Sequence, residues 1–266
     1  MSAFEEADSL YSVGNYAWAA LEYERIVFSG EQGDDVNKAL FGRVQCFKQM
    51  ESFDKASDEL LRIKTYMLNP DQLLSYYYEK ILCYYLQGKF SDALSSVDEM
   101  YLNIQDTEAC NSTLFLQILI HNELRQWDKA KEISLKYAQL HSLPDSDGVE
   151  AKIKELYAKK SIPKLKNRKV SKVLSFVPGL GHVYAGYWVE GSVAFLLNAS
   201  VLAFGVYEVW TGYYVTGYLL GAGILSATYM GGFERASFLL EKRNYEKVRA
   251  FNNHIKSELI NLPYIF

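Results

Sequence analysis

The chain has 266 residues, of which 49% are hydrophobic and 15% aromatic, and its formal net charge is −4. This length fits one large domain or two ordinary ones, and the hydrophobic content excludes a disordered chain. The acidic balance gives no overall basic field, so we expect no nucleic-acid partner. The three cysteines, Cys46, Cys83 and Cys110, form neither a disulfide framework nor a metal-binding knuckle, and the four histidines are scattered. We therefore predict no metal and no cofactor.

The first residues, AFEEADSLYSVG at 3–14, follow an amphipathic helical pattern rather than the apolar pattern of a signal peptide. A leader already removed from a longer precursor stays open as an alternative. Helical periodicity continues along the chain, so we expect an all-α fold.

The first half of the chain contains an internal repeat with a step of 37 residues. In four aligned segments, one column is aromatic and the column three residues later is alanine. This spacing is typical of stacked helix pairs, in which a small residue lets two helices cross closely and an aromatic fills the turn. Cys46 and Cys83 are also 37 residues apart, and we interpret both as structural. The repeat-packing residues are Tyr16 and Ala19, Phe53 and Ala56, Phe90 and Ala93, and Trp127 and Ala130.

The turn inside each pair carries a further signature. Gly14 and Gly88 stand two residues before the aromatic position, whereas Glu51 and Arg125 occupy that place in the second and fourth pairs. With these columns, residues 3–142 resemble a tetratricopeptide repeat array whose second and fourth copies are degenerate at the glycine. The resemblance implies four 37-residue helix pairs, stacked into a curved solenoid that offers a groove to a protein partner.

In this family the first helix of each pair lines the groove. The first row of groove positions in this chain is aromatic throughout, and a second row lies further along the same helices. The alternative is that the aromatic row packs between adjacent helix pairs. The lysine and asparagine set that grips a terminal carboxylate in some members is missing. The candidate groove residues are Phe4, Phe41, Tyr78 and Phe115 in the first row, and Tyr11 and Tyr85 in the second, where Lys48 and Asn122 take the other two positions.

Residues 145–172 are predicted to form a capping helix and a basic linker. Val149, Ile153 and Leu156 share one helical stripe, as a helix that covers the last repeat requires. Residues 159–172 then contain seven Lys or Arg, and Pro163 ends the helix.

The next segment, residues 173–233, is apolar, with no Lys, Arg or Asp and only two Glu. Gly191–Trp210 and Val215–Phe233 are each close to the roughly 20 residues that cross a hydrocarbon core as a helix. The short connection TGYY between them predicts a transmembrane helical hairpin with interfacial aromatics. The alternative is a buried hairpin inside a soluble α-domain.

Small residues recur along the hairpin and would allow close helix packing. They are Gly217, Gly221, Ala222, Gly231 and Gly232. After Phe233 the pattern becomes amphipathic again, which predicts a C-terminal helix that lies on the bilayer surface or docks on the repeats. Its apolar stripe contains Val248, Phe251, Ile255 and Leu259.

The segment 178–186, PGLGHVYAG, precedes the first predicted crossing. We expect Pro178, Gly179 and Gly181 to bend the chain here, because proline ends a helix and glycine accepts a positive φ freely. It contains G-x-G, but no strand precedes it and no Lys–Ser pair follows, so a phosphate-binding loop is not favoured. His182 with Glu208 or Glu190 would be the acid–base pair of an enzyme, yet neither a nucleophile nor an oxyanion donor accompanies it.

Together with the hairpin, this P-G-x-G-x-x-Y-x-G motif resembles a module of uncharacterised bacterial membrane proteins of the Bacteroidetes type, and it is similar to the TM2 domain. The resemblance covers residues 168–245, and it implies a membrane hairpin without an assigned activity. Members usually carry an export signal, which implies periplasmic repeats, whereas the basic residues on both flanks of the hairpin favour cytoplasmic ones. The membrane-entry residues are Pro178, Gly179, Gly181, His182, Tyr184 and Gly186.

The predicted parts are repeats at 1–144, a cap and linker at 145–172, a membrane module at 173–237 and an amphipathic helix at 238–266. We expect a membrane-anchored adaptor or scaffold of the bacterial envelope rather than an enzyme. It would bind a protein partner and hold it at the bilayer or within an envelope complex. The alternative is a membrane enzyme or transport component that uses His182 and Glu208.

Overall fold

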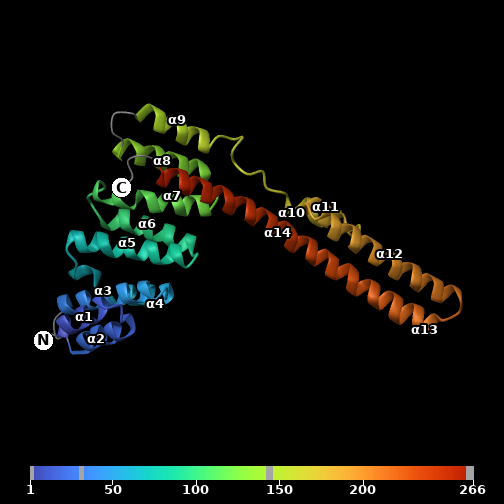
Figure 1. Ribbon diagram of the computed structural model, residues 1–266, viewed down its shortest axis with the longest axis horizontal. Coiled ribbons are helices and arrows are strands. Elements are labelled where there is room, and N and C mark those ends of the chain that lie inside the picture. The colour runs from blue at the N-terminus through green and yellow to red at the C-terminus, as the bar shows by residue number, and fades with distance from the viewer. Residues whose placement is uncertain (1–2, 30–32, 142–145, 262–266) are drawn as a thin grey trace. The chain divides into compact units, whose positions relative to one another are not determined.

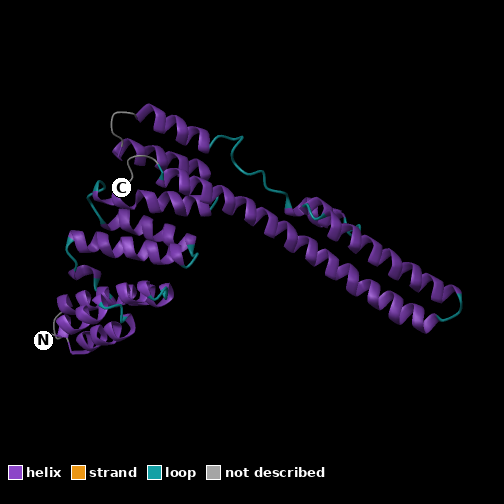
Figure 2. Cartoon of the chain, in the orientation of Figure 1, coloured by secondary structure: helices purple, strands orange, loops and turns teal. Residues whose placement is uncertain are grey.

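The computed structural model describes residues 3–29, 33–141 and 146–261. Most of these residues are helical, and no strand occurs among them (Figure 2). The predicted all-α class is therefore confirmed. The chain divides into two compact units, one made of Met1–Tyr157 with Leu259–Phe266 and the other of Ala158–Glu258. Each unit is described by itself.

In the first unit, successive helices pack against one another in chain order, from α1 to α9 (Figure 1). A short 3₁₀ turn, η1 (Thr65–Met67), connects α4 to α5, and a second, η2 (Ala109–Thr113), connects α6 to α7. The helices are α1 (Ala3–Ser12), α2 (Tyr16–Ser29), α3 (Gly33–Gln49), α4 (Phe53–Arg62), α5 (Pro70–Leu86), α6 (Phe90–Asn103), α7 (Leu114–Glu123), α8 (Trp127–His141) and α9 (Ser146–Leu156).

The four turns inside the pairs have the same geometry. Gly14, Glu51, Gly88 and Arg125 have φ values of 81°, 54°, 74° and 59°. In each turn the amide of the following residue donates a hydrogen bond to a carbonyl five residues back, at 2.8–2.9 Å. This is the left-handed cap that commonly ends a helix. Two turns without glycine thus adopt the conformation that glycine favours.

The repeat-packing residues occupy equivalent places. The aromatic column supplies the first residue of α2, α4, α6 and α8. The four alanines are fully buried, at 0% exposure. Two hydrophobic clusters continue from these positions, one around Ala19 and Tyr23 and a larger one around Leu60, Ile81 and Met100. A larger side chain at any of the four buried alanines would therefore require its neighbours to move.

Helix α9 packs on α8. Ile153 is buried, whereas Val149 and Leu156 are half-buried. Tyr157 is also buried, and its hydroxyl exchanges hydrogen bonds with the Asn122 side chain at 3.0 and 3.2 Å. The end of α9 is thus fixed to α7 by a polar contact that the hydrophobic pattern does not reveal.

Glycine at a non-glycine turn is expected to stabilise the first unit. The left-handed conformation destabilises a residue with a Cβ by about 1–2 kcal/mol. Glycine avoids this strain, but it loses more conformational entropy on folding, which offsets part of the gain. We expect Arg125→Gly to raise the free energy of unfolding by about 0.5–1 kcal/mol and Gly88→Ala to lower it by about 1 kcal/mol. No atom lies within 4 Å of a Cβ built on Gly88, so strain alone acts there. Amide hydrogen exchange measures both changes, and a loss of stability in both variants would contradict the shared geometry.

In the second unit, α11 packs on both α10 and α12, and α12 packs on η3, a π-helical segment. Ala185 of α11 also forms a small core with Leu239 and Leu240 of α14. The elements are α10 (Arg168–Leu174), α11 (Leu180–Ala185), α12 (Trp188–Trp210), α13 (Tyr214–Thr216), η3 (Gly217–Ala222) and α14 (Gly223–Ile260).

Helix α14 joins two segments that the sequence pattern separates. It begins inside the second apolar stretch and continues without a break through the amphipathic region. No proline lies between Gly223 and Ile260, and Gly231 and Gly232 keep helical φ angles, so nothing stops the helix there. All four residues of the predicted amphipathic stripe, Val248, Phe251, Ile255 and Leu259, are buried.

Candidate functional site

The first row of candidate groove residues lies on α1, α3, α5 and α7, and most of its surface is covered. Phe4, Phe41 and Phe115 are half-buried. Lys38 Nζ lies 4.4 Å from the Phe4 ring centroid, and the Phe115 ring lies 6.0 Å from that of Tyr137. Tyr78 differs, because 38% of its surface is exposed. Of this row, Tyr78 is therefore the residue best placed to meet a partner.

The second row fills the turns. The Tyr11 and Tyr85 rings lie 5.3 and 5.7 Å from the aromatic residues that begin α2 and α6. Lys48 makes an ion pair of 2.6 Å with Glu79, and Asn122 is buried beside Tyr157. Neither the lysine nor the asparagine of this row is thus available to a terminal carboxylate.

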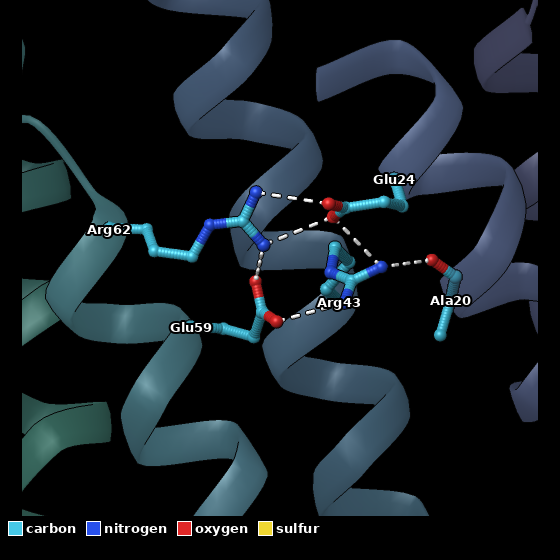
Figure 3. Close-up of polar contacts among 5 residues, drawn as sticks. All are labelled: Ala20, Glu24, Arg43, Glu59 and Arg62. Atoms are coloured by element: carbon cyan, nitrogen blue, oxygen red, sulfur yellow. Dashed lines mark hydrogen bonds and ion pairs between the residues drawn. The ribbon is translucent and has the colours of Figure 1, made fainter. Parts of the chain in front are cut away.

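An ionic network that the sequence analysis did not identify connects α2, α3 and α4 (Figure 3). Arg43 Nη1 lies 3.0 Å from Glu24 and donates to the Ala20 carbonyl at 2.7 Å, while its Nη2 lies 2.8 Å from Glu59. Arg62 contacts the same two carboxylates, at 3.0 and 2.7 Å. The Arg43 side chain is 12% exposed. The network is therefore a half-buried tie between helices rather than an open binding site.

The cysteines offer no reactive thiol. All three are buried and unbridged. Burial raises the pKa of Cys46 to about 11 and that of Cys83 to about 12, so both thiols stay protonated near neutral pH. Within residues 3–29, 33–141 and 146–261, no group of three or more His, Cys, Asp or Glu side chains is arranged to hold a metal.

The membrane-entry residues form a tight bend around α11. Gly179 and Gly186 cap this helix at its two ends, with φ values of 87° and 102°. A Cβ at Gly179 would lie 2.1 Å from the Gly191 carbonyl oxygen. Gly181, which we expected to bend the chain through a positive φ, lies inside α11, where a Cβ would stand 1.9 Å from Ser175 Oγ. That expectation was wrong for Gly181, whose role is close packing.

The other entry residues complete the bend. Tyr184 is half-buried, and its hydroxyl accepts a hydrogen bond of 3.1 Å from the Asn167 amide. Pro178 and His182 border a space of about 10 Å³ together with Asn198 and Tyr229. His182 is 4% exposed, and its Nδ1 has no hydrogen-bond partner among the described residues. The imidazole is thus enclosed by the bend.

The proposed acid–base pair is not assembled. Glu208 lies in the last turn of α12, ten residues beyond Asn198, which borders the His182 space. Ten residues of α-helix span about 15 Å, too far for proton transfer between the two side chains. Glu190 is nearer to His182, but it makes an ion pair of 3.2 Å with Arg235.

The stability of the bend is expected to depend on pH through His182. Burial lowers the pKa of His182 below its ordinary value of 6.5; the Glu190 carboxylate opposes this shift, and the Arg235 guanidinium adds to it. Below pH 6.5, the ordinary pKa of the imidazole, the unfolded chain therefore binds more protons than the folded chain. The stabilisation from the neutral imidazole is therefore complete above pH 6.5 and is lost as the pH falls toward the lower, folded-state pKa.

The melting temperature in one detergent, measured at about pH 7.5 and about pH 5.5, tests this. We expect a larger decrease for the natural chain than for His182→Gln. Burial also lowers the pKa of His121, but that residue is present in both chains and cancels in the comparison. Equal decreases would contradict a buried neutral His182.

Comparison with protein-family models, with curated proteins and with solved structures found no match to this chain. Its function is therefore inferred from its own residues and their geometry.

Proposed function

We propose that this chain is a membrane-anchored helical-repeat adaptor of the bacterial envelope. Its first unit binds a protein partner, and its second unit holds that partner at the bilayer or within an envelope complex. The observation that carries the proposal is the exposed apolar surface of α12. This helix has 23 residues, and its most apolar window has a mean hydropathy of 1.7 and is only 11% buried.

An apolar helix in the core of a soluble protein would be mostly buried instead. On α12 the exposed residues include Phe195, Leu202 and Val206, which leave apolar surface facing outward. Apolar surface costs about 25 cal/mol per Å² in water and nothing comparable in hydrocarbon. A bilayer is therefore the environment that best explains this surface, although α12 is the one helix among the described residues that meets the length and hydropathy criteria by itself.

The second crossing in this proposal is residues 215–233, which α13, η3 and the start of α14 share. Its support is the contact with α12. A Cβ at Gly221 would lie 2.7 Å from Gly205 Cα, and one at Gly217 would lie 2.6 Å from Val209 Cγ2. The Thr228 hydroxyl also donates to Asn198 Oδ1 at 3.0 Å. Close approach at glycines with a polar contact between helices is typical of membrane hairpins.

The four equivalent turns support a solenoid of four tetratricopeptide-like pairs. The partner groove of that solenoid is proposed along α1, α3, α5 and α7. Phe4, Phe41 and Phe115 shape this face from half-buried positions, and Tyr78 contributes exposed surface. Tyrosine suits such a contact because it combines a large apolar area with a hydroxyl.

A photo-crosslinking amino acid at position 78 tests the groove. We expect it to capture a defined partner in cells, whereas the same group at position 66 captures none. Tyr66 is a matched control because it is 81% exposed on η1, outside the four groove helices. Tyr78→Ala is expected to weaken capture by the natural chain while leaving helical content unchanged. Equal crosslinks at both positions would contradict the groove assignment.

The side of the membrane is a separate part of the proposal. Two crossings put both flanks on one side, and their basic residues favour the cytoplasm. The resemblance of the membrane module favours the periplasm, which is the side we propose for the repeats. Labelling of Leu102→Cys in intact cells with a membrane-impermeant thiol reagent decides, because Leu102 is 85% exposed. Protection of this cysteine until the cells are lysed would place the repeats in the cytoplasm.

A further inference from the structure

Two basic segments that are far apart in the sequence lie together in the second unit. The Asn244 side chain exchanges two hydrogen bonds of 2.9 Å with the backbone amide and carbonyl of Lys166. Lys247 Nζ donates to the Lys164 carbonyl at 3.2 Å. Arg168 makes an ion pair of 3.1 Å with Glu241. The linker is therefore held along α14, and its charges add to those of the helix.

We call residues 159–172 and 235–249 together the basic collar. It contains twelve Lys or Arg and two Glu, in a chain whose net charge is −4. Lys169, Lys172, Lys242 and Arg243 are exposed and make no ion pair among the described residues. The collar is thus a concentrated positive surface with free cationic side chains.

Aromatic side chains border the collar. Lys166 Nζ donates a hydrogen bond to the backbone carbonyl of Tyr184 and lies 5.4 Å from the Tyr184 ring centroid. Trp188, at the first residue of α12, is exposed, and so is Tyr245, which lies within the α14 part of the collar. From the linker into α12 the chain therefore passes from cationic residues to Tyr184 and Trp188 and then to an apolar helix. That order corresponds to the headgroups, the interface and the hydrocarbon core of a bilayer.

We propose that the basic collar binds the anionic headgroups of membrane phospholipids. This inference rests on the proposed membrane location of the second unit. Charge complementarity selects the lipid class, since each Lys or Arg near an anionic leaflet contributes about 1 kcal/mol at physiological salt. The hydrogen bonds of Lys164 and Lys166 with α14 keep the cations of the two segments close together. A zwitterionic surface offers them no net charge.

The test uses the full chain reconstituted in nanodiscs that contain spin-labelled phosphatidylglycerol or spin-labelled phosphatidylcholine. We expect motionally restricted phosphatidylglycerol to exceed phosphatidylcholine by about twofold or more, with the excess reduced in high salt. The triple variant Lys169→Glu, Lys172→Glu and Lys242→Glu should remove the excess. The matched control reverses three exposed lysines of the first unit, Lys89, Lys129 and Lys136, and should retain it.

Three outcomes would overturn the inference. Equal restriction of the two lipids by the natural chain would exclude a preference for anionic headgroups while leaving the membrane location intact. A chain that stays soluble without detergent would remove the proposed function and this inference together. Retention of an RNA oligonucleotide that competes with phosphatidylglycerol and is lost in the triple variant would identify a nucleic-acid surface instead.

Discussion

Arg43→Ala is expected to lower the stability of the first unit by about 3–5 kcal/mol. The arginine lies between Glu24 and Glu59, which belong to different helices, and it also binds the Ala20 carbonyl. Its removal leaves two carboxylates that share Arg62, whose side chain is 40% exposed. Loss of one partner from a half-buried ion pair is costly because the other charge remains desolvated.

Hydrogen exchange in α2, α3 and α4 of the full chain measures this change. We expect exchange to become faster by about a hundredfold or more, since 1.4 kcal/mol corresponds to a factor of ten. Arg25→Ala is the matched control, because Arg25 is 71% exposed and pairs with Glu22 in the same helix. An exposed pair contributes about 0–1 kcal/mol. Similar effects of the two substitutions would show that the network in Figure 3 does not tie the helices together.

Gly221→Leu is expected to separate α12 from η3. The obstacle to a Cβ at this position is the main chain of Gly205, at 2.7 Å, so no side chain can move aside to make room. Overpacking of a well-packed site costs about 1–3 kcal/mol, and a backbone obstacle places this variant at the upper end. We expect a clear decrease in the melting temperature of the full chain in detergent.

Gly223→Leu is the control for this substitution. Gly223 is two residues further along, it is exposed, and no atom lies within 4 Å of a Cβ built there. Both variants add the same apolar side chain to the same apolar segment. A decrease of equal size in both would mean that the close glycine contact does not hold the two helices together.

The helical class follows from sequence periodicity because an amphipathic helix repeats its apolar face every 3.6 residues. The 37-residue columns also locate the helix starts, since Tyr16, Phe53, Phe90 and Trp127 each begin a helix. The shared turn at Glu51 and Arg125 was missed because neither residue favours a positive φ. Their place in the glycine column was the signal that could have identified it.

Other features depend on contacts between distant residues. Arg43 contacts Glu24 and Glu59 only once three helices have packed together, and no local sequence pattern predicts these contacts. The role of Gly181 likewise depends on Ser175, which caps the end of α10. For the groove, an aromatic column suits both partner binding and packing, so exposure in the folded chain is needed to distinguish Tyr78 from Phe41.

Nitroxide accessibility in liposomes tests the proposed membrane location of α12. A spin label at Phe195→Cys, Leu202→Cys or Val206→Cys, in a chain whose native cysteines are alanine, samples exposed positions along the helix. We predict that oxygen reaches these labels readily and that a polar nickel complex does not, whereas the nickel complex reaches a control label at Leu102→Cys. Free access of the nickel complex to the α12 labels would show that this helix does not lie in the hydrocarbon core.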